Sequence, residues 1–456
     1  MCLSAGGSTN VGLNTPYKCM QPICLPREMP LPNPEKITHK ETHRMDDSED
    51  SRPRVIGMDL HPDSMAAVTL VGQTARAATV IATHQHVAAS DIGAYLERHT
   101  RATDVIVVEA GNTSFAFEEL ASKLQRKVIV LNSTKAGQIG KSYCKNDMLD
   151  AHKLGIIYLS GLCDEVWVPD AQTRTRRSIS HGHGNAVKDA TQARNRLKSF
   201  LTSHGIRLGS GASVSDKTGQ ERVRQSAEWD AEQLMLIETM IADIDHAEEQ
   251  RRKLVSHMAE IALDDDEMIK LMKLCGVGLI AAYKLMAVIG DIGRFANPKK
   301  LVAYFGLNPG VRDSGERQRR FGVGLSGRSQ IRVTMVQCAQ AILRSGDAYG
   351  GKLRKWGLAT VFRKGRNIAV IAVARKLTVA AWYLLRGFYT PLLQDAEKSI
   401  RAKVARVIRE LGTTAIGNAG YESVKACRTV LLSKLLGEEN APTPPQKGDA
   451  PIAVPS

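Results

Sequence analysis

The stretch 55-VIGMDLHPDSMAAVTLVG-72 decides the fold of the N-terminal part of this chain, because it holds two short apolar runs around one polar turn. Val55–Leu60 and Met65–Gly72 have the composition of β-strands, and His61–Ser64 is short enough to connect them as a hairpin. Ala77–His86 (AATVIATHQH) follows as a third strand. Strands this close together in sequence predict an antiparallel meander.

The residues after this meander predict an α/β domain over 54–165. Asp104–Glu109 (DVIVVE) has four branched aliphatic residues in a row, which is typical of a strand buried on both faces. The apolar spacing predicts helices over 91–99, 114–127 and 147–160 and a short strand over 128–131.

The composition favours a helix-rich protein with a polyanionic partner. The chain has 456 residues, of which 43% are hydrophobic and only 5% aromatic, and its formal net charge is +15. Residues 266–435 contain 30 Lys and Arg against 10 Asp and Glu, so this region carries +20 and the remainder carries −5. Such an excess can be a solvated surface, but it favours binding to nucleic-acid phosphates with a steep salt dependence.

Several other classes of protein are excluded by the sequence. The longest apolar runs, Ile368–Ala374 and Leu377–Leu385, are separated by Arg375 and Lys376, and neither reaches the roughly 18 residues that span a bilayer. We therefore expect no membrane association. The eight cysteines form no CxxC pair, which indicates cytosolic thiols.

The chain outside the α/β domain divides by composition. We expect disorder over 1–52, where Met45 is an alternative start, and over 437–456. Residues 171–265 predict a helical coiled-coil or linker, with long helices over about 171–203 and 220–262 separated by a Gly/Ser segment. That insert can be a spacer, or it can serve dimerisation or grip a nucleic acid. Residues 266–435 form a basic, mostly helical domain.

Four carboxylates suggest a metal site. Asp59 ends the first strand, Glu109 ends the DVIVVE strand, and Asp147 and Asp150 share one face at the start of a helix. Four converging acids repel one another unless a cation lies between them, and hard oxygen ligands suit Mg²⁺. Two such ions about 4 Å apart commonly serve phosphodiester displacement. Taken singly, each Asp can instead be a turn or N-cap residue.

The order of these acids resembles the DEDD arrangement of RuvC-type Holliday-junction resolvases. That resemblance implies a ribonuclease-H-like fold for residues 54–165. The pair three residues apart on a helix differs from the pattern of DDE integrases.

The basic domain contains a second group of motifs. Leu274–Ala282 (LCGVGLIAA) has the hGhG pattern of a helix–hairpin–helix, in which Gly276 and Gly278 let backbone N–H groups approach a phosphate. Ser314-Gly315 lies between basic clusters, where a serine hydroxyl can attack a phosphate or simply occupy a turn. Ser326 begins a second Ser-Gly. The basic residues that we expect to contact nucleic acid are Lys299, Lys300, Arg312, Arg317, Arg319, Arg320, Arg328 and Arg332.

The segment Gly276–Arg344 resembles the C-terminal domain of the IS one-ten insertion-sequence transposases, also called bridge-RNA-guided recombinases. The matching features are the GxG hairpin, the run from Arg294 to Pro309, the Ser-Gly dipeptide and the Gly-x-x-x-x-Arg motif at Gly327–Arg332. With the DEDD domain, the resemblance covers about 54–390.

This resemblance implies a transposase and site-specific recombinase that acts on donor and target DNA. It implies that Asp59, Glu109, Asp147 and Asp150 bind Mg²⁺ and that Ser314 is the nucleophile of a covalent serine–DNA intermediate. It also implies a structured noncoding guide RNA, a homotetramer arranged as a dimer of dimers, and a cytoplasmic, nucleoid-associated location in bacteria.

Three other functions remain open from the residues alone. A RuvC-like junction endonuclease that acts by hydrolysis needs the four acids but not Ser314. An actin-like ATPase or sugar kinase needs glycine-rich phosphate turns, whereas Leu60-His61-Pro62-Asp63 follows Asp59. A non-catalytic nucleic-acid-binding protein needs neither the acids nor the serine.

Overall fold

The computed structural model describes residues 54–139, 146–207, 209, 213–314, 317–323, 327–388 and 395–437. The chain divides into two compact units, Met1–Val166 and Trp167–Ser456, and each is described by itself. We expect disorder over 1–52 and 437–456. These segments lie outside the described residues, except for Gly437.

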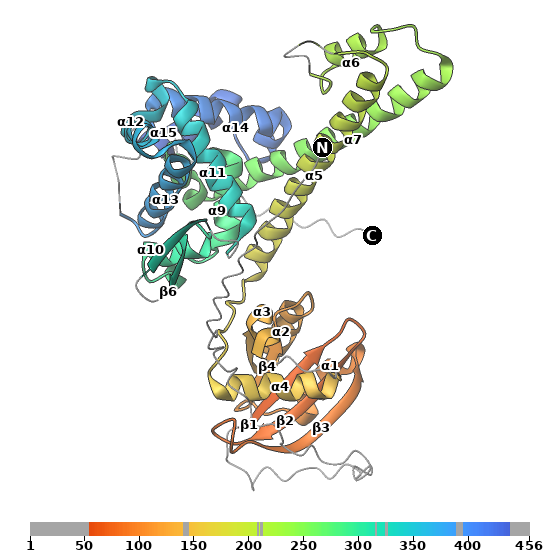
Figure 1. Ribbon diagram of the computed structural model, residues 1–456, viewed down its shortest axis with the longest axis vertical. Coiled ribbons are helices and arrows are strands. Elements are labelled where there is room, and N and C mark those ends of the chain that lie inside the picture. The colour runs from red at the N-terminus through yellow and green to blue at the C-terminus, as the bar shows by residue number, and fades with distance from the viewer. Residues whose placement is uncertain are drawn as a thin grey trace, which may run out of the picture. The chain divides into compact units, whose positions relative to one another are not determined.

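The N-terminal unit is built on a five-stranded mixed sheet in the order β3-β2-β1-β4-β5 (Figure 1). Its strands are β1 (Arg54–Leu60), β2 (Ser64–Val71), β3 (Thr79–Ala88), β4 (Val105–Glu109) and β5 (Lys127–Leu131). The first three pair antiparallel, so the predicted meander is confirmed. β4 joins β1 in parallel and β5 joins β4 in parallel. The result is the α/β fold that the strand pattern predicted.

The helices that accompany this sheet in the described residues are α1 (Ile92–His99), α2 (Ser114–Lys123), α3 (Ser133–Ile139) and α4 (Asp147–Ser160). The predicted helix over 114–127 ends four residues early, because the chain turns through Gln125, which has a positive φ of 56°, into β5. α4 begins and ends at the predicted residues. Asn146 caps its first turn by accepting a hydrogen bond from the backbone N–H of Met148 at 3.0 Å.

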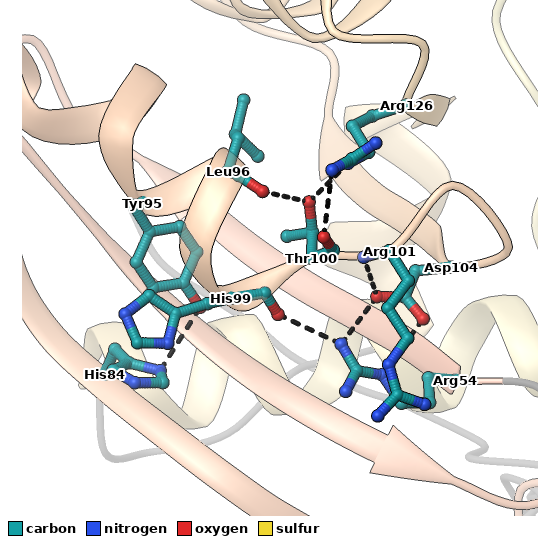
Figure 2. A network of polar contacts seen from close by, with 9 residues as sticks. All are labelled: Arg54, His84, Tyr95, Leu96, His99, Thr100, Arg101, Asp104 and Arg126. Carbon is teal, nitrogen blue, oxygen red and sulfur yellow. Dashed lines mark hydrogen bonds and ion pairs between the residues drawn. The ribbon is translucent and has the colours of Figure 1, made fainter. Parts of the chain in front are cut away.

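A buried ion pair fixes the start of β1 (Figure 2). The guanidinium of Arg54 donates two hydrogen bonds to the carboxylate of Asp104, at 2.9 and 2.6 Å, and a third to the carbonyl of His99 at 3.0 Å. The Arg54 and Asp104 side chains are only 7% and 1% exposed. Arg126 holds the next turn by donating to the Thr100 hydroxyl at 2.8 Å and to its carbonyl at 3.0 Å. This network ties β1 to the loop that follows α1.

The C-terminal unit begins with a helical hairpin. α5 (Ala171–Ser203) and α7 (Ala231–Asp264) lie side by side with α6 (Lys217–Arg224) between them in sequence (Figure 1). Their shared core is small and aliphatic and includes Ala193, Leu197, Leu201, Ile237, Ile241 and Ile244.

The first long helix matches the predicted 171–203, but the single helix predicted over 220–262 is wrong. Asp230 starts α7 afresh with a capping box, in which its carboxylate accepts from the Gln233 backbone and the Gln233 side chain accepts from the Asp230 backbone. The indole of Trp229 donates to the Val223 carbonyl at 3.1 Å and closes the end of α6.

The rest of this unit is mostly helical, as predicted. Its helices are α8 (Asp266–Met272), α9 (Leu279–Ile289), α10 (Pro298–Tyr304), α11 (Ser329–Arg344), α12 (Asp347–Lys364), α13 (Arg366–Leu385), α14 (Glu397–Asn418) and α15 (Val424–Leu436). They enclose the largest hydrophobic core of the described residues. By length and composition α13 could cross a membrane, but 56% of its apolar window is buried inside the protein. Its apolar side chains therefore serve this core.

A β-hairpin interrupts the helices. β6 (Pro309–Ser314) and β7 (Arg317–Val323) pair antiparallel, and the last pair of their register joins Ser314 to Arg317. The sequence pattern did not predict these strands.

Candidate functional site

Two strand ends place the first two acids at one edge of the sheet. Asp59 is the second-last residue of β1 and Glu109 is the last residue of β4. The parallel register pairs Met58 with Val108, so the next residues, Asp59 and Glu109, lie level on neighbouring strands. Since alternate residues of a strand point to the same face, Asp59 shares its face with Gly57.

Gly57 brings α4 to this edge of the sheet. A Cβ atom at Gly57 would lie 1.9 Å from the carbonyl oxygen of Ala151 and 2.9 Å from the backbone nitrogen of Gly155. Only a glycine allows the α4 backbone to approach β1 this closely. Asp147 lies one turn before Ala151, and this contact therefore carries the first turn of α4 toward Asp59.

The side chains of Asp59 and Asp147 both lie beside His61. The Nε2 atom of His61 lies 3.4 Å from the Asp59 carboxylate and 3.5 Å from the Asp147 carboxylate. One ligand atom from each of these three residues lies within 4.8 Å of the other two. Asp150 is close enough for its charge to act on Asp59, and Lys153 donates to the Asp150 carboxylate at 2.8 Å.

Burial and mutual repulsion act on the two strand-end acids. Burial raises the pKa of Asp59, His61 opposes this shift, and the carboxylates of Asp150 and Asp147 raise the pKa further. Burial also raises the pKa of Glu109, to which the charges of Asp59 and Asp150 add. The four acids therefore interact electrostatically as one group, and a cation among them would relieve the repulsion.

The donor chemistry of this group fits a divalent cation. Carboxylate oxygens are the ligands that Mg²⁺ prefers, and the imidazole of His61 adds a nitrogen donor that suits transition metals. Asp59, His61 and Asp147 can each offer one ligand atom to the same ion. Their side chains are 20%, 46% and 49% exposed, so an ion and a substrate could both reach them.

The four acids were predicted from the sequence, whereas His61 was not among the predicted ligands. Its position two residues after Asp59 was the available signal, because a turn at the end of β1 returns the side chain to the same edge. Lys153 was not singled out. A Lys three residues after an Asp on a helix is a common surface pair, and nothing in the sequence marked this one.

The nucleophile predicted by resemblance lies in the other unit. Ser314 is the last residue of β6, and its partner across the hairpin is Arg317. Arg312 and Arg319 form another pair of the same register, and Val311 pairs with Arg320. The hairpin backbone thus carries the four predicted arginines on the two strands that flank Ser314. Ser326 lies outside the described residues.

The segment predicted to form a helix–hairpin–helix is the turn that joins α8 to α9. Gly276 has a φ of 73°, which favours glycine, and a Cβ atom there would lie 2.6 Å from the Ile342 side chain. Its role in this structure is therefore close packing against α11. Gly278 is the N-cap of α9 and has open space around it, so this glycine can admit a ligand.

The remaining predicted basic residues lie around α10 and α11. Lys299 and Lys300 are exposed in the first turn of α10, behind the Asn297 cap. Arg328 is exposed at the N-cap of α11, with its guanidinium 5.7 Å from the centre of the Tyr304 ring. Arg332 donates to the Gly306 carbonyl at 3.4 Å, which gives it a structural contact.

Sequence reasoning missed an arginine–aromatic cluster around Tyr304. The Arg294 guanidinium stacks 4.1 Å from the ring centre of Trp167 and 4.6 Å from that of Tyr304. Burial opposes ionisation of Tyr304, but Arg328, Arg294 and Arg177 together lower its pKa. These residues come from distant parts of the sequence, so no local motif marked them.

The N-terminal unit thus holds a cluster of carboxylates, and the second unit is mostly helical and strongly basic. Residues 269–352 match the transposase IS116/IS110/IS902 family. This finding confirms the predicted family resemblance.

Known transposases match more of the chain. A putative transposase y4qE of Sinorhizobium fredii is 29% identical over 51% of this chain and 56% of its own length. The transposase for insertion sequence element IS1328 of Yersinia enterocolitica is 24% identical over 52% of this chain and 71% of its own. The transposase for insertion sequence element IS1111A of Coxiella burnetii is 23% identical over 44% of this chain and 55% of its own. The chain thus spans about half the length of the first of these relatives.

Proposed function

We propose that this protein is the transposase of an insertion sequence and cleaves and rejoins DNA strands with a divalent cation. The observation that supports the proposal most is the position of the acids, with Asp59 and Glu109 near the ends of β1 and β4, Asp147 and Asp150 in the first turn of α4, and Asp59 and Asp147 within reach of His61. The sheet order β3-β2-β1-β4-β5, antiparallel and then parallel, supports a ribonuclease-H-like, RuvC-type fold for this unit. The family match of residues 269–352 supports the DNA substrate.

The residues that would hold Mg²⁺ are Asp59, Glu109, Asp147 and Asp150. A bound ion supplies positive charge beside the reacting phosphate oxygens. Between the acids, His61 stays within reach of both Asp59 and Asp147 and steadies their side chains. Lys153 holds Asp150 through its 2.8 Å hydrogen bond.

Ser314 is the proposed nucleophile. Its Oγ loses a proton and forms a bond to phosphorus. At the same time one P–O ester bond of the strand breaks, and the departing sugar oxygen takes up a proton. A strand-end hydroxyl then displaces the serine and restores the ester. Since one ester replaces another, no high-energy cofactor is consumed. We expect Arg312, Arg317, Arg319 and Arg320, which the backbone of β6 and β7 carries near Ser314, to hold the scissile phosphate.

We further propose that a structured noncoding RNA guides the choice of donor and target DNA and that the active form is a homotetramer. These two proposals rest on the family resemblance. The +20 charge of residues 266–435 supports the binding of RNA and DNA backbones.

Strand cleavage on a denaturing gel tests the function. The full-length protein is incubated with labelled donor-junction DNA, its flanking transcript and Mg²⁺, beside the variants Ser314→Ala and Asp59→Asn. Wild type should give cleavage with a slow, protease-sensitive covalent adduct, and both variants should lose the adduct.

The same gel separates the alternatives. Cleavage by Ser314→Ala without any adduct in either protein would make the chain a hydrolytic, RuvC-like junction endonuclease. Cleavage that survives Asp59→Asn would remove the carboxylate cluster from the chemistry. Asp164→Asn serves as the matched control and should cleave normally, because Asp164 is an exposed acid that pairs with Lys135 and not with the cluster.

A further inference from the structure

A cleft in the C-terminal unit runs along α5, α9 and α11. It consists of two adjoining cavities of about 780 and 610 Å³, which share Ser180, Ser329 and Gln330 as lining residues. α5 runs beside α9 in Figure 1. No acidic side chain lines either cavity within the described part of the chain.

Two helices begin at this cleft without a side-chain cap. Gly278 is the N-cap of α9, and residues 278–281 line the first cavity. α11 begins at Ser329 behind Arg328, and Ser329 and Gln330 line both cavities. The first N–H groups of a helix have no partner inside the helix, and they carry a partial positive charge. Both helix starts therefore offer donors to an anion in the same cleft.

A buried histidine independently indicates a missing ligand. His183 of α5 lines the first cavity, is only 5% exposed, and has no hydrogen-bond partner at either ring nitrogen among the described residues. A buried polar group without a partner is costly, so an unfilled donor here points to a group that binds in the cleft. Burial, Lys284 and Arg251 lower the pKa of His183 to about 4, so its ring is neutral near pH 7 and offers one N–H donor.

Cations complete the lining. Lys188 and Lys284 face the first cavity, and neither has an acidic partner among the residues that the structure describes. Arg328 lines the second cavity. Lys403 also lines the first cavity, but Asp395 neutralises it at 2.8 Å, so it is not part of the anion site.

We propose that this cleft binds the sugar–phosphate backbone of a nucleic-acid strand. Phosphates would lie at the starts of α9 and α11, where the backbone N–H groups, His183 and the cations Lys188 and Lys284 receive them. The inference rests on the proposed function in so far as the protein acts on nucleic acid. It adds His183, Lys188, Lys284 and Ser329 to the contacts already predicted at Gly278 and Arg328.

The sharpest test places a negative charge in the cleft without harming the fold. Ser329→Glu puts a carboxylate in the first turn of α11, where it should stabilise the helix and repel a phosphate. Asn367→Glu is the matched control, because it adds the same charge to the exposed first turn of α13, outside the cleft. Lys284→Gln against Lys198→Gln is a second pair, with Lys198 exposed on α5 outside both cavities.

Binding is measured by fluorescence anisotropy with the full-length protein in EDTA. One arm uses a labelled duplex DNA and the other a labelled RNA hairpin, each over a series of salt concentrations. Ser329→Glu should weaken binding about tenfold or more, and Lys284→Gln should lower the slope of log K against log salt by about one. Both controls should bind like wild type. Melting curves should show that Ser329→Glu is folded.

The DNA and RNA probes together show which nucleic acid the cleft binds. A loss with DNA alone, RNA alone or both supports the proposal and names the strand that the cleft holds. Equal binding by Ser329→Glu and Asn367→Glu with both probes overturns it, even if Asp59→Asn still abolishes cleavage and so leaves the proposed function standing. Wild type that binds neither probe would overturn both proposals.

Discussion

Gly57→Ala is expected to separate the two halves of the carboxylate cluster. The added Cβ would lie 1.9 Å from the Ala151 carbonyl oxygen, and ordinary contact begins at 3.4 Å. The obstacle is backbone on both sides, so no side chain can swing away, and β1 and α4 must part by about 1.5 Å to reach that separation. Overpacking of this kind costs about 1–3 kcal/mol of stability.

The same displacement moves Asp147 away from Asp59. A misplacement of about 1 Å in a catalytic constellation can cost roughly a hundredfold in rate. We therefore expect Mg²⁺-dependent strand cleavage to fall about a hundredfold, while urea unfolding shows a folded protein of lower midpoint. Gly155→Ala should have a smaller effect, because its Cβ would press mainly on the end of the Leu70 side chain.

Gly93→Ala is the control for this experiment. It lies in α1, and a Cβ atom there meets nothing within 4 Å. It should leave cleavage unchanged and stabilise the helix slightly, since alanine is the better helix former. Full cleavage and an unchanged urea midpoint in Gly57→Ala would refute the argument that this close contact sets the position of the acids.

Three further predictions concern buried charges. Asp59→Asn should raise the thermal midpoint in metal-free buffer at neutral pH, because the raised pKa of Asp59 means that its ionised form opposes folding. Differential scanning calorimetry should show that this increase in midpoint shrinks as the pH falls and is absent below pH 3.8, the ordinary pKa of an Asp. Arg54→Met should cost about 3–5 kcal/mol in urea unfolding, because Asp104 is left buried and unpaired, and a second change, Asp104→Leu, should recover most of it. Lys403→Met should cost a similar amount, about 3–5 kcal/mol, because Asp395 is 1% exposed, whereas an exposed-pair variant, Lys253→Met, should change the urea midpoint little.

The sheet and the positions of its acids could be predicted from the sequence because their signals are local. The apolar runs of β1 and β4 fix the strands, and each acid follows its own run directly. Asp147 and Asp150 stand at the start of a helix whose apolar spacing is regular. The approach of α4 to β1 could not be predicted, because Gly57 and Ala151 are far apart in sequence and only their contact gives the glycine its meaning.

The basic unit was predicted less completely for a related reason. Alternating apolar residues are missing from Pro309–Ser314 and Arg317–Val323, so the hairpin around Ser314 gave no strand signal. The Tyr304 cluster and the cleft beside His183 depend on helices that meet only in the folded chain. The break before Asp230 was also missed, although Asp230 and Gln233 have the spacing of a capping box.

The chemical position of the protein–DNA linkage tests the role of Ser314 most directly. Wild-type protein is trapped on donor-junction DNA in Mg²⁺, the complex is digested with protease and nuclease, and the modified peptide is sequenced by mass spectrometry. We expect a nucleotide joined through phosphate to Ser314, and no modified peptide from Asp59→Asn. A linkage at Ser326 or Tyr304, or cleaved DNA without any modified peptide, would contradict it.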